Sequence, residues 1–557
     1  MSTNKYFDKI AIALICFAIV ASVVMAMFWV PNEEDSGAIK PSKNDITKVS
    51  ATLNLDTYDG NVEITTGGTY KLKGSLEDGQ VVVDVSKKEK VILILDGVNI
   101  NCKDDSAILV KNSGSMLLYI ADGSKNIVTS GTSSSKSSSG AEGGAILLKD
   151  DATISGSGKL TVNGYINNGI QCSNTLYVES GEIVVDAVNN GIKGTDLLII
   201  DGGDITISAG NAGLKSGKSG DSNSGEIIIN NGVIDVAKSY EGAEAHTITI
   251  NDGDMRFVAS DDGLNASGGG NNFGAGMGGF GMKGQNGQTF DREQTIQNFD
   301  RNQMPQDFDA SKMPQNFDMS QIPQGIDRGQ KGQGFNRDQM MQDGNQGMER
   351  PDAPAASGKD NSQTSEEAEV TLPSLTINGG TIHIIASGDG LDSNGDLTIN
   401  GGLILVDGPR SSGNGALDSG TENGGAIRVN GGTLLAIGAS GMAETPGNES
   451  KQCSFSVTAS FNVGSTIEIL DSNGKVLVSH KTETSGNSIV FSNPSLKIGE
   501  TYTVKVDGNS QTITQSELVA KSSAGAESFG GFQKPNRGQG FERPSGDSPF
   551  EGFGPKM

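Results

Sequence analysis

The sequence predicts an all-β protein built as a parallel β-helix, and three observations lead to this fold class. The 557 residues include 79 glycines and only 5% aromatic residues, which suits many short strands joined by tight turns. Short apolar runs, such as 197–200 and 205–207, recur between these turns. Glycines repeat at a spacing of 21 or 22 residues, for example from 169 to 191. A rung of that length cannot bury its own apolar face, so successive rungs are expected to stack.

Two glycine registers and one asparagine-rich column define the rung. A glycine followed by Ile, Leu or Ala (by Met at Gly441) forms the first register, and a glycine in an Asn/Asp-x-Gly turn forms the second. Stacked amides hydrogen-bond from rung to rung, so the column is expected to form a ladder. The first register is Gly169, Gly191, Gly213, Gly242, Gly263, Gly390, Gly415 and Gly441. The second is Gly203, Gly232, Gly253, Gly380, Gly402 and Gly432, and the column is Asp201, Asn230, Asn251, Asn378, Asn400 and Asn430.

The repeat divides the chain into two β-helix parts separated by a long insertion and followed by a cap. The insertion is rich in Gly, Gln, Met and Phe, carries Phe-Asp pairs every nine residues, and is too polar to fold alone, which predicts disorder. It serves either as a spacer or as an adhesive segment. The cap is predicted to consist of antiparallel hairpins, one turning at Asn473-Gly474. The predicted boundaries are 31–50 for a linker, 51–266 and 369–453 for the β-helix, 267–368 for the insertion, 454–518 for the cap and 519–557 for a disordered tail.

The N-terminal segment predicts a membrane anchor. Residues 10–30 carry no charge, and at about 1.5 Å per residue a helix of this length crosses a bilayer core. Lysines precede this segment in residues 1–9, which are predicted to be cytoplasmic, and acidic residues follow it. The charge bias predicts a single-pass protein of the cell membrane with the bulk of the chain outside the cell.

Charge and histidine content exclude several classes of function. A formal net charge of −25 argues against a nucleic-acid partner, because such partners require a basic surface. The three histidines, His246, His383 and His480, are spread over the chain. Their spacing predicts neither a metal triplet nor a nucleophile pair.

Acidic residues flank the first glycine register in three consecutive rungs. Two unit charges about 4.8 Å apart repel each other by about 3.5 kcal/mol at an effective dielectric of about 20. A hard divalent cation with oxygen ligands relieves this repulsion. The sequence therefore predicts bound Ca2+, with a solvated acidic edge as the alternative. The candidate ligands are Glu241, Glu244, Asp261, Asp262, Asn265, Asp389, Asp392, Asn394 and Asp396.

Two lysines occupy equivalent positions one or two rungs before the acidic residues. Lys193 and Lys215 are candidate ligand-binding residues for the carboxylates of an acidic polysaccharide. A pectate-type lyase also needs a calcium-held uronate and a basic side chain that abstracts a proton, so lyase activity stays open as an alternative. Aromatic platforms for neutral sugars are sparse, since the single tryptophan lies in the predicted anchor.

Five segments resemble the clostridial-type carbohydrate-binding domain family. They are residues 68–76 (GTYKLKGSL), 91–100 (VILILDGVNI), 143–146 (GGAI), 491–496 (FSNPSL) and 499–502 (GETY). The resemblance spans about 45–518 apart from the insertion. It implies a right-handed parallel β-helix akin to polysaccharide lyases, bound calcium, and attachment to polygalacturonate without established lyase activity.

These observations predict a non-catalytic, cell-surface protein that binds acidic, pectin-like polysaccharide through calcium. The first alternative is a calcium-dependent pectate-type lyase, and the second is a structural adhesion protein of the cell surface. The expected partners are an acidic polysaccharide and the membrane that holds the anchor. The sequence leaves the oligomeric state open.

Overall fold

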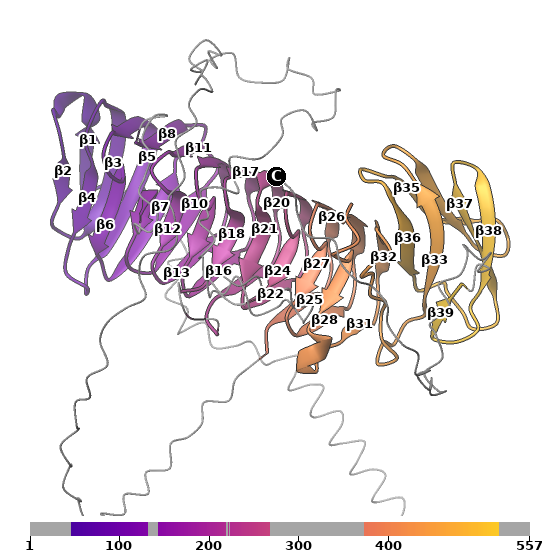
Figure 1. Cartoon of the computed structure of the whole chain (residues 1–557). Coiled ribbons are helices and arrows are strands. Elements are labelled where there is room, and N and C mark those ends of the chain that lie inside the picture. Colours follow the sequence, from indigo (N-terminus) through magenta and orange to yellow (C-terminus); the bar gives the residue numbers. More distant parts are fainter. Residues whose placement is uncertain (1–45, 132–142, 219–220, 222, 268–371, 523–557) are drawn as a thin grey trace, which may run out of the picture. The chain divides into compact units, whose positions relative to one another are not determined.

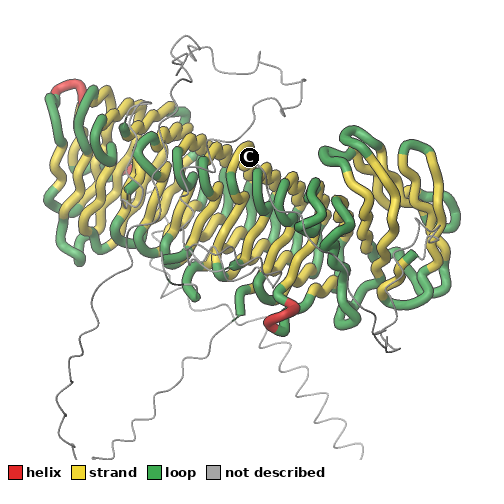
Figure 2. Tube along the Cα trace, viewed as in Figure 1, coloured by secondary structure: helices red, strands yellow, loops and turns green. Residues whose placement is uncertain are grey.

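Strands dominate the described part of the chain, which comprises residues 46–131, 143–218, 221, 223–267 and 372–522 of a computed structural model (Figures 1 and 2). Short 3-10 helices, η2 (Leu55–Thr57) and η6 (Thr421–Asn423), lie in turns between strands. The predicted all-β class and the parallel pairing of successive rungs are confirmed.

Each complete rung contributes three strands, and each strand pairs in parallel with its counterpart in the next rung. The first ladder is an 11-stranded sheet of β2 (Val62–Ile64), β4 (Val81–Asp84), β6 (Ile108–Asn112), β9 (Gly144–Leu148), β12 (Asn168–Cys172), β15 (Ile192–Gly194), β18 (Ala212–Ser216), β21 (Glu241–Ala245), β24 (Leu264–Ala266), β27 (Leu391–Ser393) and β30 (Leu417–Ser419).

The second and third ladders join into one sheet, because the long strand β5 (Lys90–Cys102) takes part in both, and three strands of the C-terminal segment bring this sheet to 24 strands. The second ladder also contains β1 (Ala51–Asn54), β3 (Gly68–Leu76), β7 (Ser115–Ile120), β10 (Ala152–Gly156), β13 (Thr175–Val178), β16 (Leu197–Ile200), β19 (Glu226–Ile229), β22 (Thr247–Ile250), β25 (Ser374–Ile377), β28 (Asp396–Ile399) and β31 (Ile427–Val429). The third contains β8 (Lys125–Ser130), β11 (Lys159–Gly164), β14 (Glu182–Ala187), β17 (Asp204–Ala209), β20 (Val233–Ser239), β23 (Asp254–Ala259), β26 (Thr381–Ala386), β29 (Leu403–Asp407) and β32 (Thr433–Gly438).

The two glycine registers have different physical causes. Gly203, in the second register, has a φ of 104°, a backbone conformation that strongly favours glycine. Gly213, in the first register, lies so close to the next rung that a Cβ atom would stand 2.5 Å from Val236 Cγ1 and 2.7 Å from the carbonyl oxygen of Gly242. The assignment of Gly415 to the first register was wrong by one residue, because Ala416 pairs with Gly390.

The predicted asparagine ladder is confirmed. Each Nδ2 atom in the column donates to the Oδ1 atom of the preceding rung at 2.7 to 2.9 Å. The chain of bonds runs from Asp201 to Asn430 without a break. It continues across the insertion, where Asn378 donates to Asn251 at 2.8 Å although 127 residues separate them.

The rungs on either side of the insertion are direct neighbours. β24 pairs with β27 in the register Asn265–Asp392, and β23 pairs with β26 in the register Ala259–Ala386 (Figure 1). The stacking order that the sequence predicted across this gap is therefore confirmed. Residues 268–371, which include nearly all of the predicted insertion, lie outside the described residues.

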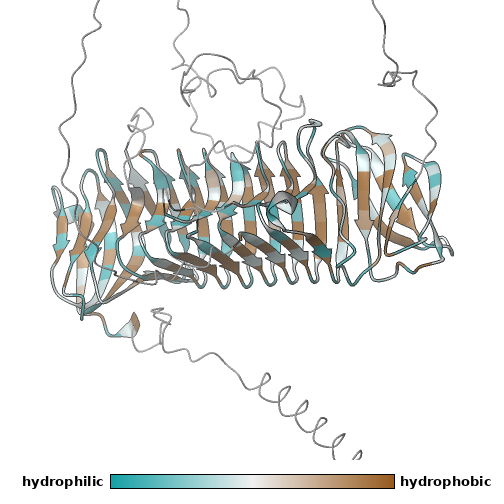
Figure 3. Cartoon of the chain, turned by 60° about the horizontal axis from the view of Figure 1, so that its bottom comes forward, coloured by the Kyte–Doolittle hydropathy of each residue, from teal (hydrophilic) through white to brown (hydrophobic). Residues whose placement is uncertain are grey.

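One apolar core runs through the stacked rungs, and a second core belongs to the C-terminal segment. Apolar residues line the strands of successive rungs (Figure 3). The C-terminal core contains Phe455, Phe491 and Tyr502, whose rings lie 5.5 to 6.2 Å apart. The strands of this segment are β33 (Ser454–Phe461), β34 (Thr466–Leu470), β35 (Val476–Lys481), β36 (Gly486–Ser492), β37 (Thr501–Val506), β38 (Asn509–Thr514) and β39 (Val519–Lys521).

Antiparallel pairing sets the C-terminal segment apart from the rungs. Strands β35, β34, β37 and β38 form a separate four-stranded antiparallel sheet, and the hairpin predicted at Asn473-Gly474 joins β34 to β35. β36 pairs antiparallel with β32, the last strand of the third ladder. Antiparallel strands therefore cover the end of that ladder.

None of the helices in the described part of the chain is long and apolar enough to cross a membrane. The predicted anchor at 10–30 and the cytoplasmic segment at 1–9 fall outside the described residues, as does nearly all of the tail. The anchor therefore stays a prediction.

Candidate functional site

One outward-facing column of the first ladder carries five of the eleven predicted site residues. In the three-residue strands β15 and β27 of this ladder the middle residue is more exposed than its two buried neighbours, because side chains alternate along a strand. The outward residues pair in consecutive rungs as Gln171, Lys193, Lys215, Glu244, Asn265, Asp392 and Asp418. Charge therefore changes from basic to acidic along the column.

A second column stands immediately before the glycine of each rung. In the early rungs it consists of asparagines, and Asn168 Oδ1 accepts the backbone N–H of Asn190 at 3.0 Å. In the later rungs it consists of carboxylates, and Asp262 Oδ1 accepts the backbone N–H of Asp389 at 2.7 Å. Asp389 Oδ1 accepts the backbone N–H of Gly415 at 2.6 Å. An aspartate thus makes the same rung-to-rung bond that an asparagine makes earlier.

The two columns bring five predicted ligands into two overlapping groups. In one group, oxygen atoms of Glu241, Asp261 and Asp262 all lie within 4.8 Å of one another. In the other group, the same holds for Asp262, Asp389 and Asp392. Asp262 belongs to both, so we call these five residues the carboxylate cluster.

Burial and mutual repulsion raise the pKa values of four carboxyls in this cluster, those of Glu241, Asp262, Asp389 and Asp392. Desolvation, followed by the charges of Asp261 and Asp389, raises the pKa of Asp262 to about 8. Desolvation also raises the pKa of Asp389 to about 6, despite the hydrogen bond from Gly415. The pKa values of Glu241 and Asp392 lie well above the ordinary range, with desolvation as the first cause in each. Burial therefore disfavours the charged form of these four carboxyls, and a bound cation would offset that penalty.

Two buried oxygen atoms beside the cluster accept no hydrogen bond. Asn265 donates from Nδ2 to Glu241 Oε1 at 3.3 Å and to Asp262 Oδ2 at 3.2 Å. Its own Oδ1 atom is buried without a donor, and so is Glu241 Oε2. Such unpaired acceptors normally cost about 1–3 kcal/mol each. Carboxylate and amide oxygens at this density are the donor set that Ca2+ prefers, so the residues fit a calcium ion.

The other predicted site residues divide between those next to the cluster and those apart from it. Glu244 stands in register with Asn265 and forms an ion pair with Lys215, whose side chain is only 13% exposed. Lys193 lies one rung further away, in register with Lys215. Both lysines therefore lie within two rungs of the acidic residues, as predicted.

Asp396 contacts other partners than the carboxylate cluster. Asp396 Oδ1 lies 2.7 Å from a guanidinium nitrogen of Arg428 and accepts the backbone N–H of Ala426 at 3.1 Å. Asn394 lies in the turn between β27 and β28. The structure therefore divides the acidic run 389–396 between two locations.

Asp418 escaped the sequence analysis, although it stands in register with Asp392 and its charge contributes to the raised pKa of that residue. The one-residue error at Gly415 hid it. The repeated tripeptide Leu-Asp-Ser, at 391–393 and at 417–419, was the signal that could have found it.

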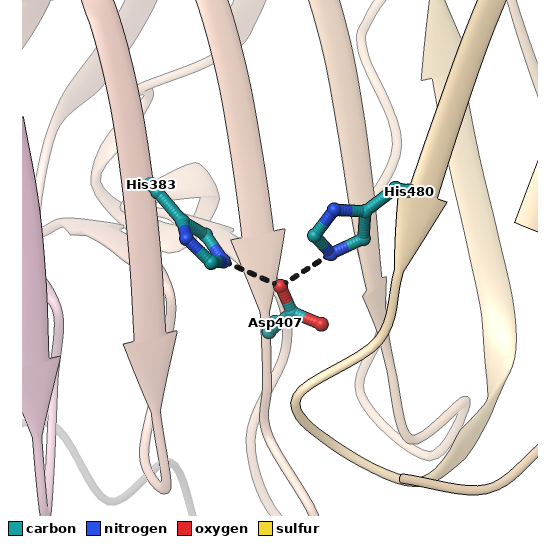
Figure 4. A group of neighbouring side chains, drawn as sticks. All are labelled: His383, Asp407 and His480. Carbon is teal, nitrogen blue, oxygen red and sulfur yellow. Dashed lines mark hydrogen bonds and ion pairs between the residues drawn. The ribbon is translucent and has the colours of Figure 1, made fainter. Parts of the chain in front are cut away.

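Two of the three histidines come together with an aspartate, which their spacing in the sequence did not predict. His383 on β26 and His480 on β35 meet at Asp407, the last residue of β29 (Figure 4). Their Nε2 atoms lie 2.8 and 2.7 Å from Asp407 Oδ2, and the two rings are nearly perpendicular with centroids 5.4 Å apart. The three residues are 24 and 73 positions apart in sequence, and His480 comes from the antiparallel sheet. No short sequence motif predicts this contact.

Stacked parallel strands with a column of carboxylates and lysines on one ladder define an all-β protein with a charged binding face. The chain belongs to the carbohydrate-binding domain-containing protein family, whose model matches residues 58–408, more than half of its length. It is 35% identical over 166 residues to a carbohydrate-binding domain-containing protein of Acetivibrio thermocellus. That match covers 27% of this chain and 58% of the relative.

A solved structure is also similar to part of the chain. It is titled as the polysaccharide lyase-like protein from C. thermocellum, gadolinium derivative, and is 31% identical in sequence. The match covers 39% of this chain and 90% of that structure, with a TM-score of 0.34.

Proposed function

We infer that this protein binds acidic polysaccharide of the polygalacturonate type through calcium and does so without catalysis. The observation that carries the proposal is the carboxylate cluster, with its five acidic side chains, two unpaired buried oxygens and adjacent Lys215. Membership of a carbohydrate-binding family supports the ligand class. The three ladders support a right-handed parallel β-helix, on which the cluster and the lysines share one ladder.

Calcium provides the link between two anionic partners. The protein carries a net charge of −25, so an acidic polymer is repelled unless a cation bridges it to the surface. Calcium takes 6–8 oxygen ligands, and part of that shell can come from the carboxylates of a uronate. Asp389 and Asp392 would hold the ion on the protein side, and Asp262 would join the two groups.

The lysines favour binding over catalysis. A lyase base must be free to take a proton from the sugar ring. Lys215 is instead committed to an ion pair with Glu244, and both side chains are largely buried. Lys193, one rung away, is placed to attract a polymer carboxylate. We therefore propose that pectate-type lyase activity is absent.

The proposed location is the cell surface, with residues 10–30 as the membrane anchor. This assignment rests on the uncharged N-terminal segment and the charge bias around it. Binding of a polymer outside the cell would then hold the cell against that polymer.

The test is binding of the full chain to immobilised polygalacturonate in millimolar calcium and in EDTA. Binding should appear in calcium and disappear in EDTA, and unsaturated uronide should not accumulate. The double variant Asp389→Asn/Asp392→Asn should bind at least about tenfold more weakly, which corresponds to about 1.4 kcal/mol. A matched control is Asp252→Asn/Asp254→Asn, which removes one charge from the turn after β22 and one from the first residue of β23, and which should bind like the parent.

Three outcomes would overturn parts of the proposal. Equal binding in EDTA would remove the role of calcium. An equal loss of polygalacturonate binding in both double variants would mean that binding depends on the overall charge of the protein and not on the carboxylate cluster. Release of unsaturated uronide that is lost in Lys193→Ala or Lys215→Ala would make the protein a lyase.

A further inference from the structure

The histidine pair and Asp407 form a second group of potential metal ligands, separate in composition from the carboxylate cluster. The side chain of Asp407 is fully buried, that of His480 is 8% exposed, and that of His383 is 25% exposed. Asp407 stands in register with Ile385 and Ile437, so its strand neighbours are apolar. Ile437 itself belongs to the C-terminal core.

A carboxylate in such surroundings needs a cationic partner. The Nε2 atoms of His383 and His480 both lie within hydrogen-bond distance of Asp407 Oδ2. A carboxylate between two neutral imidazoles would leave one uncompensated negative charge inside the protein. Buried charges are normally paired or bound to a metal.

The geometry leaves one carboxylate oxygen directed at both rings. Asp407 Oδ1 accepts the backbone N–H of Glu483 at 2.8 Å, which fixes the orientation of the carboxylate. Oδ2 then faces the Nε2 atoms of both histidines (Figure 4). These three atoms lie within 4.8 Å of one another and are the only such set among the described residues that includes imidazole nitrogens.

We propose that His383, Asp407 and His480 bind a divalent transition metal of the zinc class. Two imidazole nitrogens and one carboxylate oxygen match the preference of Zn2+, whereas Ca2+ takes oxygen ligands. The fourth position would be open on the side of His383, the most exposed of the three. The ion would supply the positive charge that the buried carboxylate requires.

Such a metal would join two sheets of different architecture. His383 and Asp407 belong to the parallel third ladder, and His480 belongs to the four-stranded antiparallel sheet. Besides the metal ligands, Arg410 approaches the carbonyl oxygen of Glu483 at 3.4 Å near the same place. Bound metal would therefore hold the antiparallel sheet against the last rungs, and it would do so independently of polysaccharide binding.

The experiment is a calorimetric titration of the metal-free full chain with Zn2+, followed by Co2+ addition and visible absorption spectra. We expect one Zn2+ per chain, competition by Co2+, and cobalt bands of a tetrahedral nitrogen and oxygen site. His480→Gln and Asp407→Asn should each weaken Zn2+ binding by more than about 100-fold, because even residues that only support a ligand change metal affinity by about 10–100-fold.

Two controls separate this site from the rest of the molecule. His246→Gln alters the remaining histidine and should leave the Zn2+ affinity unchanged. Asp389→Asn/Asp392→Asn should also leave it unchanged, which distinguishes the proposal from the calcium site. Circular dichroism of each variant establishes that it is folded.

Three results would overturn the proposal. The first is an absence of Zn2+ binding by the parent, which would make the group a hydrogen-bonded cluster only. The second is an unchanged Zn2+ affinity in the folded variants His480→Gln and Asp407→Asn. The third is octahedral Co2+ bands without nitrogen ligands, which would point to the carboxylates instead.

Discussion

The early and late rungs accept the same backbone hydrogen bond from the next rung, but they do so with different side chains. Before the glycine of each rung, Asn168 and Asn190 accept a backbone N–H from the next rung, and Asp262 and Asp389 accept the equivalent N–H. The amides also bond to one another, since Asn190 donates to Asn168 Oδ1 at 2.9 Å. Neutral asparagine is therefore sufficient for the fold. The negative charge of the late rungs lowers the stability of the fold unless a proton or a cation compensates it.

The largest expected difference between the two regions is in their response to pH. The carboxylates of the late rungs should make the free energy of unfolding depend on pH, whereas the asparagines of the early rungs should not. A raised pKa means that the folded protein keeps protons which the unfolded chain has released. Without calcium, stability should therefore fall as the pH rises from about 4, the ordinary carboxyl pKa, toward 8, where Asp262 titrates. The loss should be on the order of a few kcal/mol. Urea unfolding of the parent in EDTA at pH 5 and pH 8 measures it.

The variant Asp389→Asn/Asp392→Asn serves as the control for that loss, because it removes two of the titrating groups and should flatten the profile. A parent whose stability in EDTA is level over this range would show that the carboxylates are well solvated.

Exchanging asparagine and aspartate at the position before the glycine should have opposite effects on stability in the two regions. Asn190→Asp removes the amide donor and places a carboxylate oxygen against Asn168 Oδ1, which should cost about 1–3 kcal/mol. Asp262→Asn restores the residue of the early rungs, and Asn265 can turn its unpaired oxygen toward the new amide. At pH 8 in EDTA this variant should be as stable as the parent or more stable. Urea unfolding of both variants under one condition makes the comparison, and losses of similar size would contradict it.

Removal of the insertion should have the smallest effect. The rungs on both sides pair directly, and the single residue His246 is enough to connect β21 to β22 in the preceding rung. Deleting residues 267–368 leaves 369–373 to make the equivalent connection. Loop-closure cost changes slowly with length, so the melting midpoint should stay or rise slightly. Loss of the cooperative melt or of the β-type circular dichroism would mean that the insertion is part of the fold.

The fold could be predicted because its causes are local and repeated. A positive φ at Gly203 and the close approach at Gly213 recur in consecutive rungs, so the glycine spacing carried the register even across the insertion. The asparagine ladder follows from the same repetition. At Gly415 the glycine lies one residue away from the register position. The register predicted there was therefore wrong, and Asp418 was missed.

The candidate site could be predicted only as far as it follows the repeat. The carboxylate cluster lies at repeated positions, and five of the nine predicted metal ligands come together in it. Asp396 was lost to Arg428, a partner 32 positions later that the repeat does not specify. The meeting of His383 with His480 depends on how the antiparallel sheet packs, and no spacing in the sequence encodes that.

The most direct test of the calcium account is a thermal melt of the parent and of Asp389→Asn/Asp392→Asn, each with calcium and with EDTA. Free calcium at about 100 times its dissociation constant should stabilise the parent by about 2.7 kcal/mol per site, because the ion binds the folded cluster and not the unfolded chain. The double variant should lose most of this gain and, in EDTA, be no less stable than the parent. Equal calcium shifts in the two proteins would contradict the account and reduce the carboxylate cluster to an acidic edge.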